Sequence, residues 1–295
     1  MSTAIELIPA FEGHQRRRGR TESTIELYHR PLAAFAEWAG DRDLDSLTPR
    51  DMEMYFDHYE AVFVERNGKP PAQNTRRKAD QAIRNFFKWA ERYDYVTKTP
   101  MRQIDPPPVF RKSNDWLRPE DDAKVLDACM TREEYLAVYL LRFTGLRASE
   151  AVNLRWSDVE WANGQLWVSV TKSKTARGIR RVPVPRELAP ILVQPGLAKH
   201  GMLNEPDGWV FQTRTGKPWH RNQLYSVVKR VGQRAGVDLY PHRLRKTLGS
   251  AAFNAGADLT TISRILGHSS TQITEQAYAE LTTAKVADDF LKAVG

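Results

Sequence analysis

The spacing of hydrophobic and polar positions predicts helices in the first third of the chain. The apolar positions between Tyr28 and Trp38 fall on one helix face, and Gly40 follows where a helix should end. Thr48 and Pro49 have the residue types of an N-cap and a first helical position. Residues 74–92 predict a further helix with one apolar and one basic face, although an ordinary solvated helix has the same pattern.

The second half of the chain combines helical spacing with strand-like alternation. The dense apolar run 135–143 predicts a helix that ends at Gly145. Residues 165–171 and 178–184 alternate with a period of two, as strands do, and residues 209–211 are a candidate third strand. We therefore predict a mainly α-helical fold in which a small antiparallel sheet belongs to the second half.

A proline-rich break separates the two halves. Pro106, Pro107 and Pro108 interrupt any helix, and the residues after them are polar and basic, as is typical of a linker. We expect a helical domain over residues 1–104, a linker over 105–116 and a second domain over 117–295. A chain of 295 residues is long enough for two domains with separate cores.

Composition adds a weak sign of a polyanionic partner. Lys and Arg number 44 against 36 Asp and Glu, a net charge of +8. Residues 1–110 hold equal numbers of basic and acidic side chains, so the excess lies in residues 111–295. Within the balanced front part, basic residues still cluster along the predicted helix 74–92. The candidate DNA contacts there are Arg76, Arg77, Lys78 and Arg84.

Other classes of protein are excluded by simpler features. The single cysteine, Cys129, rules out an internal disulfide and a cysteine-based zinc site, and its apolar surroundings indicate a core residue. No stretch reads as a membrane span, and the N-terminal segment lacks the pattern of a secretory signal. We expect the protein to stay in the cytosol.

Five residues of the second half together have the chemistry for breaking a phosphodiester without a metal. Arginines offer planar forks of donors that fit phosphate oxygens, and their charge persists at any working pH. A tyrosine hydroxyl can attack phosphorus and form a covalent intermediate, and histidines suit the proton transfers near neutral pH. The five residues are Arg147, His242, Arg245, His268 and Tyr278.

Local sequence places these side chains at helix ends. Arg147 follows the helix stop at Gly145, and Glu150 can support it from the next helix. His242 and Arg245 are three residues apart, which puts both on one helix face. His268 comes directly after a short predicted helix. That helix, taken by itself, could equally be half of a helix-turn-helix.

The order and context of these residues resemble the tyrosine recombinase (phage integrase, Xer-like) family. The segments are TGLRASE, PHRLRKT, ILGHSS and TEQAYAEL, and the front segments TESTIELYHRPLAAFAEW and NTRRKADQAIRNFFKWAERYDYV resemble the family's core-binding domain. The resemblance implies a helical, SAM-like core-binding domain that binds DNA. It also implies a catalytic domain of the DNA-breaking-rejoining fold, helical with a small antiparallel sheet.

The resemblance also implies roles for the site residues. Arg147 and Arg245 would hold the scissile phosphate, His268 would help to neutralise it, His242 would transfer a proton and Tyr278 would be the nucleophile. Relatives often carry histidine where Lys246 stands, so no role is carried over to that lysine. Relatives commonly have nine residues from the LGH histidine to the tyrosine, against ten here, which could displace the nucleophile.

A lysine between two strands is the general acid in relatives. Counting back from Pro183 selects Lys174, with Lys172 as the alternative, and a solvated hairpin turn is the third reading. Burial against DNA beside other cations would supply the lowered pKa that such an acid needs. Basic residues near this turn are expected to contact phosphates, with Arg243 facing solvent or DNA backbone. The residues near the turn are Arg177, Arg180 and Arg181.

The expected function is site-specific DNA recombination through a 3′-phosphotyrosyl link, with no cofactor, metal or ATP. The resemblance implies double-stranded DNA as substrate, a homo-tetramer on synapsed DNA, no membrane, and a cytoplasmic, nucleoid-associated protein of bacterial or phage origin. Integration of a viral genome, excision and chromosome-dimer resolution all stay open. Alternatives are a type IB topoisomerase and an inactive DNA-binding relative.

The two ends of the chain add two expectations. The chain begins almost directly with the core-binding domain, so we expect a simple recombination site, and the basic residues 16–20 read as a vestigial arm or as disorder. Residues 284–294 predict an amphipathic helix that docks either on a neighbouring subunit or on its own domain.

Overall fold

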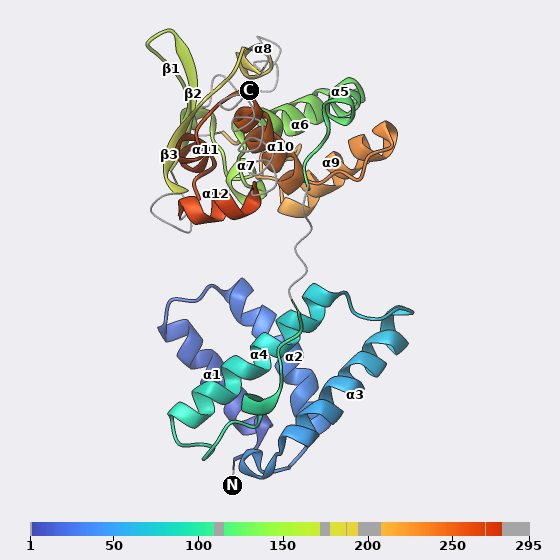
Figure 1. Cartoon of the computed structure of the whole chain (residues 1–295). Helices are drawn as coiled ribbons and strands as arrows, with labels where there is room; N and C mark the ends of the chain where they lie inside the picture. The colour runs from blue at the N-terminus through green and yellow to red at the C-terminus, as the bar shows by residue number, and fades with distance from the viewer. Residues whose placement is uncertain are drawn as a thin grey trace, which may run out of the picture. The chain divides into compact units, whose positions relative to one another are not determined.

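The computed structural model describes residues 2–108, 115–171, 178–186, 188–193, 208–268 and 270–278. The chain divides into two compact units, Met1–Arg111 and Lys112–Gly295 (Figure 1). The predicted fold class, mainly α-helical with a small antiparallel sheet, is confirmed. The domain limits 1–104 and 117–295 remain predictions. Among the described residues, no helix is long and apolar enough to span a bilayer.

The first unit is helical throughout. The helices predicted around Tyr28–Trp38 and over residues 74–92 are confirmed, and Thr48 caps a helix that begins at Pro49. Two short 3-10 turns, Leu44–Ser46 and Pro100–Gln103, connect or follow the longer elements. The four helices are α1 (Ala4–Arg17), α2 (Glu22–Ala39), α3 (Pro49–Asn67) and α4 (Gln73–Arg92) (Figure 1).

The helix α1 was not predicted, and it corrects the expectation for the basic stretch. Arg16 and Arg17 form its last turn and are not part of a disordered arm. Thr3 and Glu6 build a capping box at the start of α1, and its apolar residues recur at helical spacing on the buried side. Both signals, the capping box and the helical spacing, are present in the sequence, but the apolar run that carries the spacing is short.

Aromatic rings fill the core of the first unit. Phe35, Phe86 and Phe87 are fully buried and meet edge to face, with ring centroids 5.6–6.5 Å apart. Phe11 of α1 joins them at 5.7 Å from Phe86. The hydroxyl of Tyr55 on α3 donates to the carbonyl of Pro31 on α2 at 2.9 Å, which satisfies the one polar atom of this ring.

Helix α6 of the second unit packs against α9 and α10. A three-stranded antiparallel sheet of order β1-β2-β3 lies beside the helices (Figure 1). The strands are β1 (Val159–Ala162), β2 (Gln165–Val170) and β3 (Arg180–Pro183), and a 3-10 turn, Trp156–Asp158, precedes β1. The helices are α5 (Pro119–Asp127), α6 (Arg132–Thr144), α7 (Ala148–Ala151), α8 (Ala189–Val193), α9 (Arg221–Ala235), α10 (Pro241–Asn254), α11 (Leu259–Leu266) and α12 (Thr271–Ala277).

The third strand differs from the prediction. Residues 209–211 do not join the sheet; Trp209 forms only an isolated bridge to Arg155 and stacks beneath its guanidinium at 4.2 Å. The third strand is β1, which pairs with β2 through a turn at Asn163 and Gly164. Both turn residues have positive φ, 51° and 72°. Asn-Gly is the strongest short hairpin signal, so the sequence itself contains the evidence for this pair of strands.

Gly145 ends α6 where three helices come together. Its φ is 63°, in the left-handed region that favours glycine. A Cβ atom at this position would lie 2.7 Å from Leu266 of α11 and 2.9 Å from Leu248 of α10. The glycine therefore allows the chain to turn and also allows α10 and α11 to approach the end of α6.

We predict that Gly145→Ala destabilises the second unit more than Gly236→Ala. Gly236 ends α9 with φ 68°, and a Cβ atom there would have no neighbouring side chain or loop atom within 4 Å, so alanine adds only backbone strain, about 1–2 kcal/mol. Overpacking at Gly145 should add about 1–3 kcal/mol. Chemical denaturation of both variants measures the difference in the free energy of unfolding, and equal losses would contradict the close approach.

Candidate active site

Three arginines bind three successive backbone carbonyls at the C-terminal end of α11. The last carbonyls of a helix have no partner within the helix and form the negative end of its dipole, so they attract cations. The arginines come from the turn before α7, from β3 and from α10, and α11 packs against both β3 and α10. The bonds are Arg180 Nε to Ile265 O at 2.6 Å, Arg245 Nη2 to Leu266 O, and Arg147 Nη2 to Gly267 O at 2.6 Å.

Glu150 is the carboxylate that joins two of these arginines. Arg147 Nη1 donates to Glu150 at 2.7 Å, and Arg180 donates to both carboxylate oxygens at 3.0 and 3.2 Å. Burial of the carboxyl favours a higher pKa, but the hydrogen bonds from Arg180 and from the Arg147 backbone and side chain outweigh it. The pKa of Glu150 is therefore lowered and the group stays charged. The expected support of Arg147 by Glu150 is confirmed.

Arg245 is the most enclosed cation of the site. It is 2% exposed, and its second guanidinium bond goes to the carbonyl of Gly145. Burial, followed by the charges of Arg147 and Arg180, lowers its pKa. The guanidinium still remains protonated at neutral pH, so the site contains an excess of positive charge that a phosphate would offset.

The two histidines stand in the field of these arginines. His268 follows α11 directly, and its Nδ1 lies 2.8 Å from Thr274 Oγ1 on α12. Burial, then Arg245 and Arg147, lower the pKa of His268 to about 4. Desolvation of the ring, then Lys246 and Arg245, also lower the pKa of His242. Both imidazoles are therefore mainly neutral near pH 7 and able to accept a proton.

Tyr278 lies next to this cluster but inside the protein. Its residue exposure is 1%, and its hydroxyl donates to the carbonyl of Lys246 at 3.4 Å. Gly249 faces the ring so closely that a Cβ there would lie 1.8 Å from the hydroxyl oxygen. Burial raises the pKa of Tyr278 to about 12, and the charge of Arg245 lowers it only in part. The phenol is thus protonated and rests against the backbone of α10.

The structure brings four of the predicted residues into one electrostatic cluster and places the tyrosine beside it. Arg147, Arg245 and His242 all act on the pKa of His268, and Arg245 acts on that of Tyr278. Lys174, Lys172 and Arg177 lie outside the described residues. Thr274 was not singled out in the sequence. It is fully buried and contacts His268, and its position four residues before Tyr278 on α12 was the available signal.

Other basic side chains are engaged within the protein. Arg180 was expected to contact DNA phosphates; instead it is buried, with 6% of its side chain exposed, and its donors go to Glu150, Ile265 and Gly178. Arg180 is buried because it lies in β3, which packs against α11. Arg243 donates to the carbonyl of Asp238.

Two of the four candidate DNA contacts on α4 are also engaged. Arg84 donates to Asp80 at 2.8 Å and to the carbonyls of Met101 and Ile104 at 2.8 and 2.6 Å. Arg76 pairs with Glu60 at 2.8 Å. These side chains therefore hold the first unit together in the DNA-free chain. Among the described residues, no group of three or more His, Cys, Asp or Glu is placed to hold a metal ion.

Comparisons with known proteins cover both units. Residues 115–285 match the family described as "Phage integrase family", and residues 11–93 match "Phage integrase, N-terminal SAM-like domain". A tyrosine recombinase of Thermosipho africanus is 27% identical over 280 residues, which is 93% of this chain and 94% of that protein.

Two solved structures share the fold at low sequence identity. The XerH site-specific recombinase in a post-cleavage complex with its palindromic difH substrate has a TM-score of 0.76 at 18% identity. The match covers 98% of this chain and 84% of that one. A lambda integrase tetramer bound to a Holliday junction has a TM-score of 0.69 at 17% identity, covering 92% and 79%.

We predict that Glu150→Gln lowers the stability of the second unit strongly at neutral pH, by about 3–5 kcal/mol, because two arginines lose their shared carboxylate. The folded-state pKa of Glu150 is lowered, so its contribution is complete above the ordinary value of 4.5 and is lost as pH falls through the folded-state pKa. Denaturant unfolding at neutral and acidic pH measures this. The gap between wild type and variant should narrow on acidification.

The matched control is Glu160→Gln. Glu160 pairs with Arg181 at 2.8 Å in the same unit, but half of each side chain is exposed, so its loss should change the free energy of unfolding by less than about 1 kcal/mol. Similar effects of the two substitutions would show that Glu150 does not hold the arginine cluster together.

Proposed function

The chain belongs to the phage integrase family, and from this premise we propose that it is a site-specific tyrosine recombinase that cuts and rejoins double-stranded DNA. The observation that carries the proposal is the clustering of Arg147, Arg245 and His268 at the end of α11, next to Tyr278. This arrangement gathers fixed positive charge beside Tyr278, the one tyrosine among residues 270–278.

The proposed cluster acts first through electrostatics. Charge builds on the non-bridging oxygens as the phosphorus is attacked, and preorganised cations stabilise that charge without rearranging during the reaction. Arg147 and Arg245 provide two guanidiniums whose orientation is already fixed by α11 carbonyls. Protonation of His268, or a hydrogen bond from it, adds to them. Burial, then the charges of Arg245 and Arg147, lower the pKa of His268, and a bound phosphate would offset the effect of those charges.

The proposed reaction replaces one phosphate ester with another at each step, so no outside source of energy is needed to rejoin the DNA. The phenol oxygen of Tyr278 bonds to the scissile phosphorus, its proton passes to the neutral imidazole of His242, and the bond to the 5′ oxygen breaks. Lys174 gives a proton to that leaving oxygen. The products are a 3′-phosphotyrosyl link and a free 5′-hydroxyl, and the reverse attack by a 5′-hydroxyl from another strand rejoins the DNA.

Tyr278 must leave its buried position before it can attack. Its ring is packed against Trp116, with centroids 6.3 Å apart, and its hydroxyl faces Lys246 and Gly249 of α10. A phosphate in solvent cannot reach a side chain that is 1% exposed. In the proposal, DNA binding is therefore accompanied by a movement of α12 and Tyr278.

We also propose a homo-tetramer on two synapsed sites and a cytoplasmic, nucleoid-associated location. Exchange between two duplexes requires four cleavages, and with one nucleophilic tyrosine per chain these require four chains. The lambda integrase tetramer on a Holliday junction is a structural relative with such an assembly. The location follows from the proposed DNA substrate.

We predict that wild-type protein forms a covalent adduct with DNA and that Tyr278→Phe does not. The preferred core site is first identified by footprinting on DNA, and a nicked duplex carrying that site then traps the protein because the cut fragment diffuses away. Gel electrophoresis under denaturing conditions measures the adduct. Tyr225→Phe is the control, since Tyr225 is an exposed tyrosine of α9 in the same unit.

Two outcomes of this experiment would contradict the proposal. An adduct that persists in Tyr278→Phe would assign the nucleophile elsewhere, and binding without any adduct in wild type would indicate a DNA-binding relative that does not cleave. Relaxation of supercoiled DNA without joining of two sites would instead favour a topoisomerase.

We predict that Lys174→Ala slows cleavage of ordinary DNA by about 10²–10⁴-fold, because the 5′ oxygen then leaves without a proton. A substrate with sulfur in place of that oxygen has a better leaving group and should restore the rate. Lys172→Ala should cleave both substrates at nearly the wild-type rate. If Lys172→Ala were the slow variant, and the sulfur-containing substrate restored its rate, the general acid would be Lys172 and not Lys174.

A further inference from the structure

Lys246 on α10 stands next to both groups that exchange a proton in the proposed reaction. It follows His242 by four residues on the same helix, so the two side chains project from one face. Its backbone carbonyl accepts the hydrogen bond from the Tyr278 hydroxyl at 3.4 Å. The family resemblance gives no role to this lysine, but its position adjoins the proposed proton acceptor and the proposed nucleophile.

Asp115 joins Lys246 to the start of α10. It accepts hydrogen bonds from Lys246 Nζ at 3.0 Å and from the hydroxyl of Tyr240, the N-cap residue of α10. Burial of Asp115 favours a higher pKa, but the hydrogen bonds from Tyr240 and Lys246 outweigh it, so its pKa is lowered. Asp115 and Lys246 therefore form an ion pair at neutral pH, with only 19% and 26% of their side chains exposed.

This ion pair acts on His242 with two opposite signs. Burial is the largest of the effects that lower the pKa of His242, and Lys246 is the second. Asp115 raises the pKa of His242, but less than Lys246 lowers it, so the positive end of the pair dominates. The charged and titratable groups that face His242 are Lys246 and Arg245 of α10, Arg147 before α7, Asp115 before α5 and His268 after α11.

A bound DNA phosphate would change the balance at His242. Negative charge beside an imidazole favours its protonated form, and a protonated histidine cannot accept the proton of the Tyr278 hydroxyl. In the proposed mechanism the charges of Arg147 and Arg245 are directed to the phosphate. The ammonium group of Lys246 instead donates to Asp115, so its charge stays beside His242 whether or not a phosphate is bound.

We propose that Lys246 and Asp115 are positioning residues of the cleavage reaction that act through His242: Lys246 keeps the imidazole in its proton-accepting form, and Asp115 limits this effect. The inference rests on the proposed function and adds two residues to its site. A histidine surrounded by cations alone would be a weak base, and one beside a phosphate without Lys246 would be protonated. The ion pair holds His242 between these two extremes.

The test removes one charge of the ion pair at a time. Lys246→Gln and Asp115→Asn neutralise its two ends, and Lys246→Arg keeps the positive charge. The matched controls are Lys124→Gln and Asp121→Asn, because Lys124 and Asp121 form an exposed ion pair on α5 of the same unit, at 3.4 Å. Thermal unfolding of the full-length variants confirms that they remain folded.

NMR titration of the DNA-free chain with isotope-labelled histidine measures the pKa of His242 directly, and the loss of one signal in His242→Gln assigns it. Lys246→Gln should raise this pKa, because the cation that opposes protonation is gone. Asp115→Asn should lower it, because the nearby negative charge is gone. In Lys246→Arg and in both α5 controls the pKa of His242 should stay at its wild-type value.

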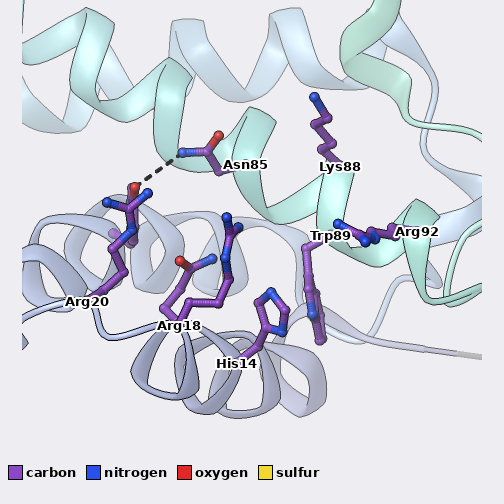
Figure 2. A pocket seen from close by; sticks show the side chains of 9 residues that line it. His14, Arg18, Arg20, Asn85, Lys88, Trp89 and Arg92 are labelled. Atoms are coloured by element: carbon purple, nitrogen blue, oxygen red, sulfur yellow. Dashed lines mark hydrogen bonds between the residues drawn. The ribbon is translucent and has the colours of Figure 1, made fainter.

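His14 provides an internal reference in the same spectra. It belongs to the first unit, where the cations Arg18 and Arg92 border the same pocket (Figure 2). Neither Lys246 nor Asp115 is part of that unit. The pKa of His14 should therefore be the same in wild type and in every variant.

The second readout is the rate of Tyr278 adduct formation on the nicked duplex, between about pH 5 and 8. The rate should rise as pH passes the pKa of His242, because the neutral imidazole accepts the proton. Lys246→Gln should move this rise to higher pH, and Asp115→Asn should move it to lower pH. A merely structural role would lower the rate of both variants at every pH. Shifts of both variants in one direction, or in neither, would overturn the proposal.

Failure of this inference and failure of the recombinase proposal are distinguishable. If wild type forms the adduct while Lys246→Gln leaves the pKa of His242 unchanged, the inference is wrong and the recombinase stands. If the pKa of His242 shifts as expected but wild type forms no adduct, the ion pair acts on His242 and the proposed function fails.

Discussion

The end of α11 is the point on which the arrangement of the second unit depends. Three of its carbonyls accept hydrogen bonds from arginines that come from the α6–α7 turn, from β3 and from α10. Without these acceptors three guanidiniums would repel one another at close range, because one carboxylate, Glu150, offsets only part of their charge. Helix α11 therefore links elements far apart in the sequence, and it does so with its own backbone, so no additional acidic side chain near the phosphate site is required.

Holding the cations in this way favours anion binding over stability. Burying arginines is costly, and carbonyl dipoles compensate the charge less completely than carboxylates do. Burial, followed by repulsion from the neighbouring arginines, lowers the pKa values of Arg245 and His268. A phosphate supplies the missing negative charge, so its binding relieves the repulsion and meets donors that are already oriented. A further carboxylate would stabilise the free protein and would compete with the substrate for the same donors.

Much of this arrangement could be predicted from sequence because local signals determine it. Thr48-Pro49 predicted a helix start, and Gly145 and Gly267 predicted helix ends that the structure confirms. The residue types of the arginine and histidine cluster, and their order along the chain, were enough to identify its members. The partners of Arg180 could not be predicted from the sequence. They depend on the packing of α11 against β3, a contact between residues 85 positions apart. The burial of Tyr278 could not be predicted either, since Gly249, which makes room for its hydroxyl, looks like any other helical glycine in the sequence.

Arg147 is accessible from solvent in the free chain, whereas Tyr278 is buried. In the free chain Arg147 already presents a side chain that is 37% exposed, so a phosphate can be bound before the nucleophile moves. Tyr278 is protonated and packed against α10 at that stage, and the reaction cannot begin on any phosphate that happens to reach the arginines. His268 contacts Thr274 on the same helix that ends at Tyr278. In the proposed mechanism, a change at the phosphate site therefore reaches the proposed nucleophile through one short element, α12. In the proposed mechanism, phosphate binding and DNA cleavage are thus separate events, and the hydrogen bond between His268 and Thr274 connects the two sites.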